Sequence, residues 1–335
     1  MSRRVLVDRR AFLAAAPAGV AAVQFPEEAA TKPKRPPTSY PDAQMYDDKE
    51  RAAVDDAVES RSLFRWYGPG RPEKVTAFEQ ELARYMGAKY ALAVTSGTAA
   101  LHVALTALAA GPGDEVILPA WGWYSCYNAI VITGALPVFA ETDESLNIDP
   151  EDVERKITPR TKAVMVLHLA GCPADMDRIM AAAGKNHIRV LEDAAQSVGA
   201  AYKGKRVAAI GEIGIFSLQI SKTITAGEGG AVLTSDPLLF ERATRFHDLG
   251  MLRPGHKERL GTSSMDSFTG VNYRMTEMTG GVMGAQLRKL DTILGRLRHN
   301  ARVVRDRIRD LPELRFRRIP DPEGEIGLGL PFTRN

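Results

Sequence analysis

Lys222 lies between an apolar run and a glycine-rich turn, in the string FSLQISKTITAGEGG (216–230). A lysine in such a place can form a Schiff base with a carbonyl compound, because a desolvated pocket lets its amine lose the proton. An isolated lysine in a loop is usually only solvated. The catalytic interpretation of Lys222 therefore depends on which other chemical groups the fold brings near it.

Carboxylates follow a second apolar run, in the string VLEDAAQ (190–196). If this run is a buried strand, an unpaired charge at its end is costly, and Asp193 requires a cation such as a protonated pyridine nitrogen. Asp is also a frequent helix N-cap. The residues alone leave both roles open for Asp193.

An anion site is predicted at 95–98, where Thr-Ser-Gly-Thr joins an apolar run to a helical pattern. Amide N–H groups at a helix N-terminus, together with a hydroxyl, bind phosphate, although Ser and Thr are also ordinary helix caps. Trp121 and Trp123 follow another apolar run, where an aromatic ring can stack on a heteroaromatic ligand or pack in the core. His168 ends a further run and can line the same pocket or pack.

The elements that position these residues alternate along the chain. Strands alternating with helices predict an α/β layer with a mostly parallel sheet, whose ligands bind at the carboxyl ends of the strands. The pattern at 281–312 predicts one long helix after this region. The expected strands are 90–95, 115–119, 136–140, 163–168, 188–192, 213–218 and 230–234, and the expected helices are 46–59, 73–85, 98–110, 123–133, 175–184 and 236–247.

Six strings, in order, resemble the DegT/DnrJ/StrS aminotransferases. They are SGTAAL, GPGDEVILPA, NIDPEDVERKITPRTKAVMVLHLAG, LEDAAQSVGA, FSLQISKTITAGEGGAVLTSD and GVNYRMTEM, and the resemblance spans about Phe64 to Arg298. The resemblance implies a fold-type-I aminotransferase-like α/β fold with a mixed, mostly parallel sheet. It also implies pyridoxal 5'-phosphate (PLP) as the cofactor and amination of keto-sugars or related rings.

Roles for individual residues follow from the resemblance. It implies that Lys222 forms the internal aldimine with PLP, and that Asp193 pairs with the pyridine nitrogen. Gln196 is expected near the ring hydroxyl, and Trp123 is expected to stack on the ring. The expected phosphate-binding residues are Gly97, Thr98 and Ser217, together with Asn272 from the neighbouring subunit of a homodimer; Arg274 is the alternative to Asn272.

The reaction implied by the resemblance moves an amino group from Gln or Glu to a keto-sugar or keto-cyclitol. Some relatives with histidine in place of the lysine are dehydratases, so Lys222 favours transamination. The string FSLQISK resembles the branch of inosose aminotransferases and aminohydroxybenzoate synthase, which indicates a ring acceptor and glutamine as donor. Two alternatives stay open: a PLP-binding protein without turnover, and another PLP chemistry such as elimination.

Composition argues against several other classes. The 44 Lys and Arg against 41 Asp and Glu give a net charge of +3, which indicates no nucleic-acid partner. No run approaches the ~20 apolar residues of a membrane helix. Cys126 and Cys172 make no disulfide framework, no G-x-G-x-x-G opens a helix after a strand, and the histidines show no metal-ligand spacing. We therefore expect no metal site.

The two ends of the chain carry separate predictions. Arg9-Arg10 and the apolar run after them resemble a twin-arginine export signal, and the alternative is a basic leader on a cytoplasmic protein. Residues 1–45 are thus expected to be a leader and proline-rich linker. Residues 46–280 are expected to form the large PLP-binding domain. Residues 281–335 are expected to hold the long helix and the start of an incomplete small domain, with a strand near 326–332.

Overall fold

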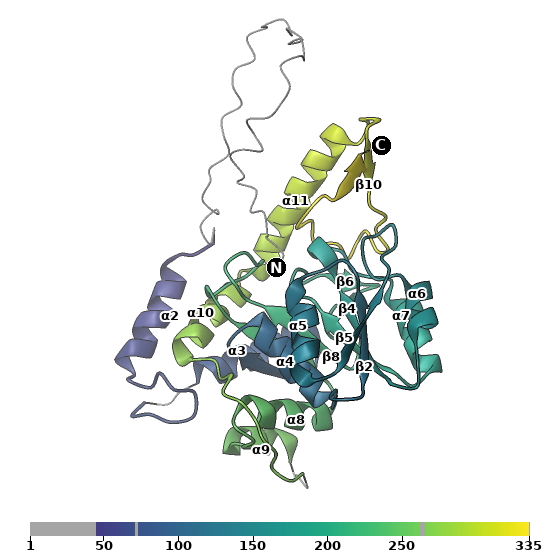
Figure 1. The fold of residues 1–335 in the computed structure, drawn as a ribbon. Helices are drawn as coiled ribbons and strands as arrows, with labels where there is room; N and C mark the ends of the chain where they lie inside the picture. Colours follow the sequence, from purple (N-terminus) through teal and green to yellow (C-terminus); the bar gives the residue numbers. More distant parts are fainter. Residues whose placement is uncertain (1–44, 71–72, 262–264, 335) are drawn as a thin grey trace, which may run out of the picture. The chain divides into compact units, whose positions relative to one another are not determined.

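The computed structural model describes residues 45–70, 73–261 and 265–334 (Figure 1). The predicted leader, with Arg9-Arg10, lies outside the described residues. Within those ranges, no helix has the length and apolar character that a bilayer crossing requires.

A seven-stranded sheet forms the centre of the described region. Its order is β1 (Tyr90–Val94), β9 (Gly230–Thr234), β8 (Ile213–Ser217), β5 (Arg189–Asp193), β4 (Thr161–Leu167), β2 (Glu115–Pro119) and β3 (Leu136–Ala140). Only β9 runs antiparallel to its neighbours, and the remaining pairs are parallel. The predicted α/β class with a mixed, mostly parallel sheet is confirmed, and every predicted strand agrees with an observed one to within two residues.

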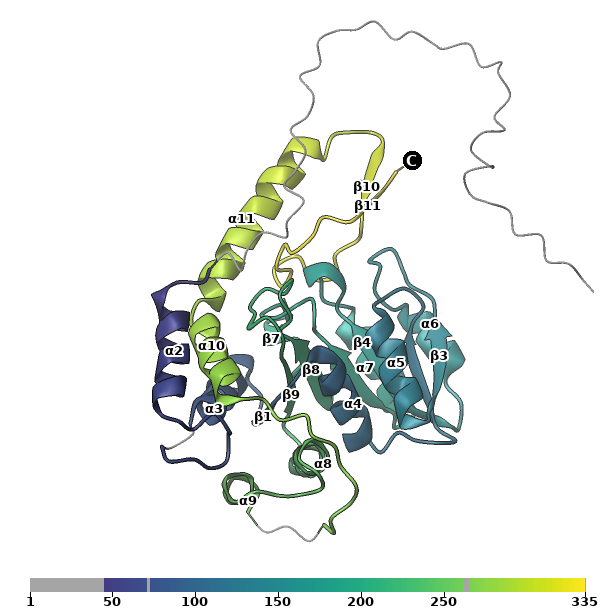
Figure 2. The ribbon, with the colours of Figure 1, turned by 60° about the vertical axis from the view of Figure 1, so that its left-hand side comes forward.

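Helices cover both faces of this sheet, which explains why its strands are continuously apolar. Alternate residues of one strand enter different cores: Leu191 packs in the cluster with α4, α5 and α8, and Val190 packs in the cluster with α6 and α7. Figure 2 shows α3 and α10 beside β1 and β9. The bounds are α3 (Lys74–Met86), α4 (Gly97–Ala107), α5 (Tyr124–Thr133), α6 (Pro150–Lys156), α7 (Met176–Lys185), α8 (Pro237–His247) and α10 (Glu277–Leu287).

The prediction of one long helix over 281–312 is wrong. The structure has α10, then a turn at Arg288 and Lys289, then α11 (Leu290–Ile308). The Lys289 Nζ atom lies 2.7 Å from each carboxylate oxygen of Glu50, which belongs to α2 (Asp48–Glu59). This buried ion pair draws the lysine inward where the helix breaks, and the spacing of apolar residues carries no sign of it.

Small elements complete the described region. Near the expected strand at 326–332, β11 (Phe332–Arg334) pairs antiparallel with β10 (Leu314–Phe316). The others are α9 (Pro254–Leu260), the short 3-10 helix η1 (Leu169–Gly171), β6 (Ala201–Tyr202) and β7 (Lys205–Arg206). The predicted domain boundary after residue 280, which falls within α10, stays a prediction.

Candidate active site

Asp193 is the last residue of β5 and is buried. Its Oδ1 accepts a hydrogen bond from Ala195 N (2.9 Å), and its Oδ2 accepts one from Cys126 Sγ (3.1 Å). Burial raises the pKa of the Asp193 carboxyl, while these hydrogen bonds and the nearby Lys222 charge act in the opposite direction. No helix begins at Asp193, so the helix-cap interpretation is wrong.

The contact between Cys126 and Asp193 was not predicted from the sequence. Cys126 lies in the first turn of α5, and 67 residues separate it from Asp193 along the chain. Burial, reinforced by the Asp193 charge, raises the pKa of its thiol well above the ordinary value. The thiol therefore stays protonated and can donate to Asp193. No local sequence signal could have revealed this pair.

Lys222 lies in the loop between β8 and β9. Backbone hydrogen bonds between residues 218–220 and 227–229 close this loop at its base, and Lys222 N donates to Gln219 O (2.9 Å). The side chain is half-buried. Burial lowers the pKa of its amine, and the Asp193 carboxylate opposes that shift. The Lys222 amine is therefore close enough to Asp193 for the two charges to influence each other.

The N-terminus of α4 meets the end of β8. Ser96 is the N-cap, and its side chain accepts a hydrogen bond from Ala99 N (3.0 Å). A Cβ added to Gly97 would lie 2.6 Å from the Cβ of Ser217, so these two residues are in close contact. The first amides of a helix have no partner within the helix. Those of Gly97 and Thr98 are therefore available to an anion, and the Ser217 side chain lies beside them.

The tryptophans after β2 are not core residues. Trp121 is 55% exposed and Trp123 is 52% exposed, so the core-packing interpretation is wrong for both. Trp123 caps α5, and its carbonyl accepts from Cys126 N (3.0 Å). Because Cys126 contacts Asp193, one helical turn carries both the exposed aromatic ring and the thiol that touches the buried carboxylate.

Gln196 follows β5 and is half-buried. Its Oε1 accepts a hydrogen bond from Ala170 N (2.9 Å), a residue of η1. A backbone N–H can only donate, so the amide oxygen must face Ala170. The NH2 group of Gln196 therefore points the other way and can donate to a ligand.

Asn272 and Arg274 lie alongside the end of β1, where Thr95 N donates to Tyr273 O (3.0 Å). The Arg274 guanidinium is paired with Asp248. Asn272 is exposed, and its Oδ1 accepts only a long hydrogen bond from Arg274 N (3.4 Å). The side-chain amide of Asn272 can therefore reach a group outside this chain more readily than the Arg274 guanidinium can.

His168 is packed rather than open to the site. It is fully buried, its Nδ1 accepts from Ala174 N (3.1 Å), and its Nε2 lies 3.0 Å from Glu192 Oε2. Because the backbone N–H must donate to Nδ1, the ring donates through Nε2 to Glu192. In the described part of the chain, no group of three or more His, Cys, Asp or Glu is arranged to hold a metal ion.

Comparison with known proteins places the chain in an aminotransferase family. Residues 45–325 match the DegT/DnrJ/EryC1/StrS aminotransferase family. The GDP-perosamine synthase of Escherichia coli O157:H7 is 37% identical over 267 residues, which cover 79% of this chain and 70% of that enzyme.

Solved structures agree with this family match. The structure of 3-amino-5-hydroxybenzoic acid synthase has a TM-score of 0.77 and 34% identity, and the match covers 86% of this chain and 74% of that one. The E. coli GDP-4-keto-6-deoxy-D-mannose-3-dehydratase with bound hydrated PLP has a TM-score of 0.78 and 28% identity, with coverage of 89% and 79%. The predicted fold-type-I aminotransferase-like fold is confirmed.

We predict that Gly97→Ala destabilises the protein, because the new Cβ would meet Ser217 at 2.6 Å and a backbone atom at 3.1 Å. Overpacking of this kind costs roughly 1–3 kcal/mol in free energy of unfolding, measurable by urea denaturation. Gly184→Ala is the matched control, because its Cβ would meet nothing within 4 Å. We expect that variant to be as stable as the parent or more stable by up to about 1 kcal/mol. Equal stability of the two variants would contradict the close α4–β8 contact.

Proposed function

The chain belongs to the DegT/DnrJ/EryC1/StrS aminotransferase family, and on that premise we propose that it uses PLP to move an amino group from Gln or Glu to a keto-sugar. The observation that carries this proposal is that the half-buried Lys222 amine, whose pKa burial lowers, lies within electrostatic range of the buried Asp193 carboxylate. Both lie at the edge of the sheet where the anion-binding end of α4 is found.

The residues at this edge fit PLP in charge and in hydrogen-bonding groups. The free amides of Gly97 and Thr98 and the Ser217 hydroxyl suit a phosphate. The Asp193 carboxylate suits a protonated ring nitrogen, and a cation there would favour the ionised form that burial alone disfavours. We assign the phosphate to α4 and the ring nitrogen to Asp193.

Two further side chains suit the ring itself. The NH2 group of Gln196, left free by the bond from Ala170 to its oxygen, can donate to the ring oxygen. The exposed Trp123 ring at the start of α5 can cover one face of the ring and exclude water from it. Lys222 would hold the cofactor through its amine, at the aldehyde carbon.

Proton transfer falls to Lys222 in this proposal. PLP, when bound, supplies an electron sink for the charge that develops on the substrate carbon. Once the amino donor has displaced it from the cofactor, the Lys222 amine would take the proton from Cα of the donor and pass it to the former aldehyde carbon, as general base and then acid. Asp193 holds the proton on the ring nitrogen, and Cys126 and Ala195 hold Asp193 in place.

A sugar acceptor is supported by the relatives. GDP-perosamine synthases of E. coli O157:H7 and Vibrio cholerae are 37% and 35% identical to this chain. We therefore propose as acceptor a keto group on the sugar of a nucleoside-diphosphate sugar. A cyclitol ketone, indicated by the string FSLQISK, is the second candidate.

A homodimer is also part of the proposal. Large apolar side chains are exposed at the end of the sheet, on α5 and the edge strand β3; they are Tyr127, Val131, Ile132, Leu136 and Phe139. Tyr127 of α5 stacks on Phe139 of β3, so these two elements share an exposed apolar surface, which is typical of a subunit interface. The family resemblance assigns the exposed Asn272, beside the end of β1, to the phosphate in the partner's site.

We expect Lys222→Ala to abolish turnover and Asp193→Asn to slow it by roughly 10²–10⁴-fold, with the far-UV spectrum unchanged in both. Borohydride reduction of the wild-type protein with PLP should add the cofactor mass to the peptide that contains Lys222. Lys185→Ala, on the exposed end of α7, is the control and should keep full activity. Near-normal turnover by Lys222→Ala would end the assignment.

The amino donor can be read from the cofactor spectrum. We expect Gln or Glu alone to remove the visible absorbance band and to leave pyridoxamine phosphate, detected by mass spectrometry. Adding the acceptor from a panel of nucleotide keto-sugars and inososes should restore the band. Product formation without pyridoxamine phosphate would indicate elimination instead, and a stable band with every donor would indicate a binding protein without turnover.

The proposed dimer predicts that one charge introduced on the apolar surface changes the oligomeric state. Ile132 is 60% exposed on α5, and Ile132→Asp should convert the dimer to a monomer in light-scattering measurements. Val304→Asp is the matched control, because Val304 is 46% exposed on α11, away from this surface. A monomeric wild-type protein at micromolar concentration would refute the proposed interface.

A further inference from the structure

We infer that Arg317, which lies outside the proposed site, is a positioning residue for Gln196. Arg317 holds the turn η1, and the Ala170 N–H in that turn orients the Gln196 amide. The inference rests on the proposed function, in which Gln196 donates to the ring oxygen. It adds a residue from the C-terminal segment to the support of the cofactor site.

The first step is the bond from η1 to Gln196. Ala170 N lies 2.9 Å from Gln196 Oε1 and fixes which end of the amide faces the ligand. If Ala170 moved away, the amide could rotate by half a turn and present its oxygen to the ring oxygen. Two acceptors would then face each other, so the position of the Ala170 N–H decides whether Gln196 attracts or repels the ring.

The second step is the conformation of Ala170. Its φ of 49° and ψ of 43° are left-handed, a conformation that is unfavourable for a residue with a Cβ. Such a conformation persists only where several contacts of the surroundings enforce it. Leu169 N donates to the buried Asn147 Oδ1 (2.9 Å), which holds one side of the turn. The other side needs a second restraint.

Arg317 supplies that restraint. Its Nη1 donates to Leu169 O (2.8 Å) and its Nη2 donates to Ala170 O (3.1 Å). The side chain is only 2% exposed, so water does not compete for these two carbonyls. One planar guanidinium thus fixes two successive peptide groups of the turn, which a lysine, with its single nitrogen, could not match.

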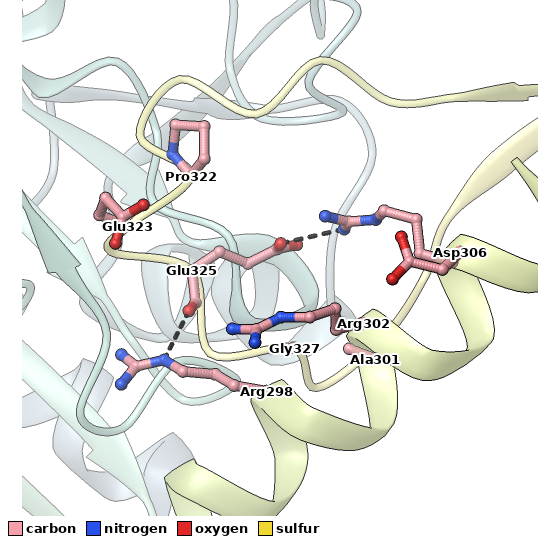
Figure 3. A pocket seen from close by; sticks show the side chains of 9 residues that line it. Arg298, Ala301, Arg302, Asp306, Pro322, Glu323, Glu325 and Gly327 are labelled. Atoms are coloured by element: carbon pink, nitrogen blue, oxygen red, sulfur yellow. Dashed lines mark hydrogen bonds and ion pairs between the residues drawn. The ribbon is translucent and has the colours of Figure 1, made fainter.

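Glu325 holds Arg317 in turn. Its Oε1 lies 3.1 Å from Arg317 Nη2, and its Oε2 lies 3.0 Å from Arg305 Nη2 on α11. Figure 3 shows Glu325 beside α11, with its backbone carbonyl bonded to Arg298 Nε (3.0 Å). The carboxylate therefore faces Arg317 on one side and the helix on the other.

Backbone hydrogen bonds also join the segment around Glu325 to the η1 region. Ile326 N donates to Gly171 O (3.0 Å), and Ala201 N donates to Gly324 O (3.0 Å). A Cβ on Gly171 would lie 2.8 Å from the Ile326 side chain, so the segment is packed tightly against the turn. The segment around Glu325 is thus fixed to η1 by the backbone as well as through Arg317.

The test compares PLP binding to cofactor-free protein in a double-mutant cycle. Loss of one hydrogen bond to a charged ring oxygen should weaken binding by roughly 10-fold or more, so Gln196→Ala and Arg317→Met should each raise Kd by that amount. If Arg317 acts through Gln196, the double variant should bind like Gln196→Ala, within about a factor of two. The visible band of bound PLP should also shift in the same direction in both single variants.

Arg315→Gln is the matched control. Arg315 is two residues from Arg317 and makes an exposed ion pair with Glu144, so this variant should bind PLP normally. If Arg317→Met does not fold, Glu325→Gln tests the same restraint and should raise Kd in a folded protein, again without adding to Gln196→Ala.

Multiplicative effects in the double variant, or normal PLP binding by Arg317→Met and Glu325→Gln, would overturn the inference and leave the proposed function standing. Failure of the wild-type protein to take up PLP would overturn both. The two ideas are therefore distinguished by whether the wild-type protein binds the cofactor.

Discussion

The arrangement of the site depends on the hydrogen bonds that hold the buried carboxylate of Glu192. This carboxylate accepts a hydrogen bond from His168 Nε2 and three from the backbone amides of Ala208, Ile210 and Gly211. A buried anion is tolerated here because donors surround it. Since side chains alternate along a strand, fixing Glu192 on the α6 and α7 face turns Asp193 to the opposite face, under α5. There Cys126 meets it.

Two glycines determine how closely the N-terminus of α4, the proposed anion site, approaches the sheet. A Cβ on Gly230, at the start of β9, would lie 2.2 Å from Ser96 O, and one on Gly97 would lie 2.6 Å from Ser217. The N-terminus of α4 can therefore approach β8 and β9 only because both positions are glycine. The orientation of its free amides follows from this packing. The site thus obtains its attraction for phosphate from backbone dipoles held by the sheet.

Local sequence patterns predicted the strands and the edge of the sheet where the site lies. The features that they did not predict depend on contacts between residues far apart in the chain. The strands could be read from their apolar runs, and Asp193, Ser217 and Lys222 could be placed at one edge because parallel strands end together. The break before α11 could not be read, because the Lys289 partner Glu50 lies 239 residues away. Cys126 was missed for the same reason. The roles of the site residues came from resemblance to a family, and the arrangement of these residues is compatible with those roles.

The site residues are held in place in two ways, by the central sheet and by the C-terminal segment. Asp193 and Ser217 stand at the ends of neighbouring strands, where the hydrogen bonds of the sheet fix them. Gln196 is fixed by a turn whose restraint, Arg317, comes from a segment 147 residues later. The Glu325 carboxylate couples that segment to α11, because it pairs with the buried Arg317 on one side and with Arg305 of α11 on the other. Removing Glu325 would leave the Arg317 charge buried without a carboxylate partner, which is costly. A ligand ring bridging Asp193 and Gln196 would thus join the sheet to the C-terminal segment, and its binding would depend on both.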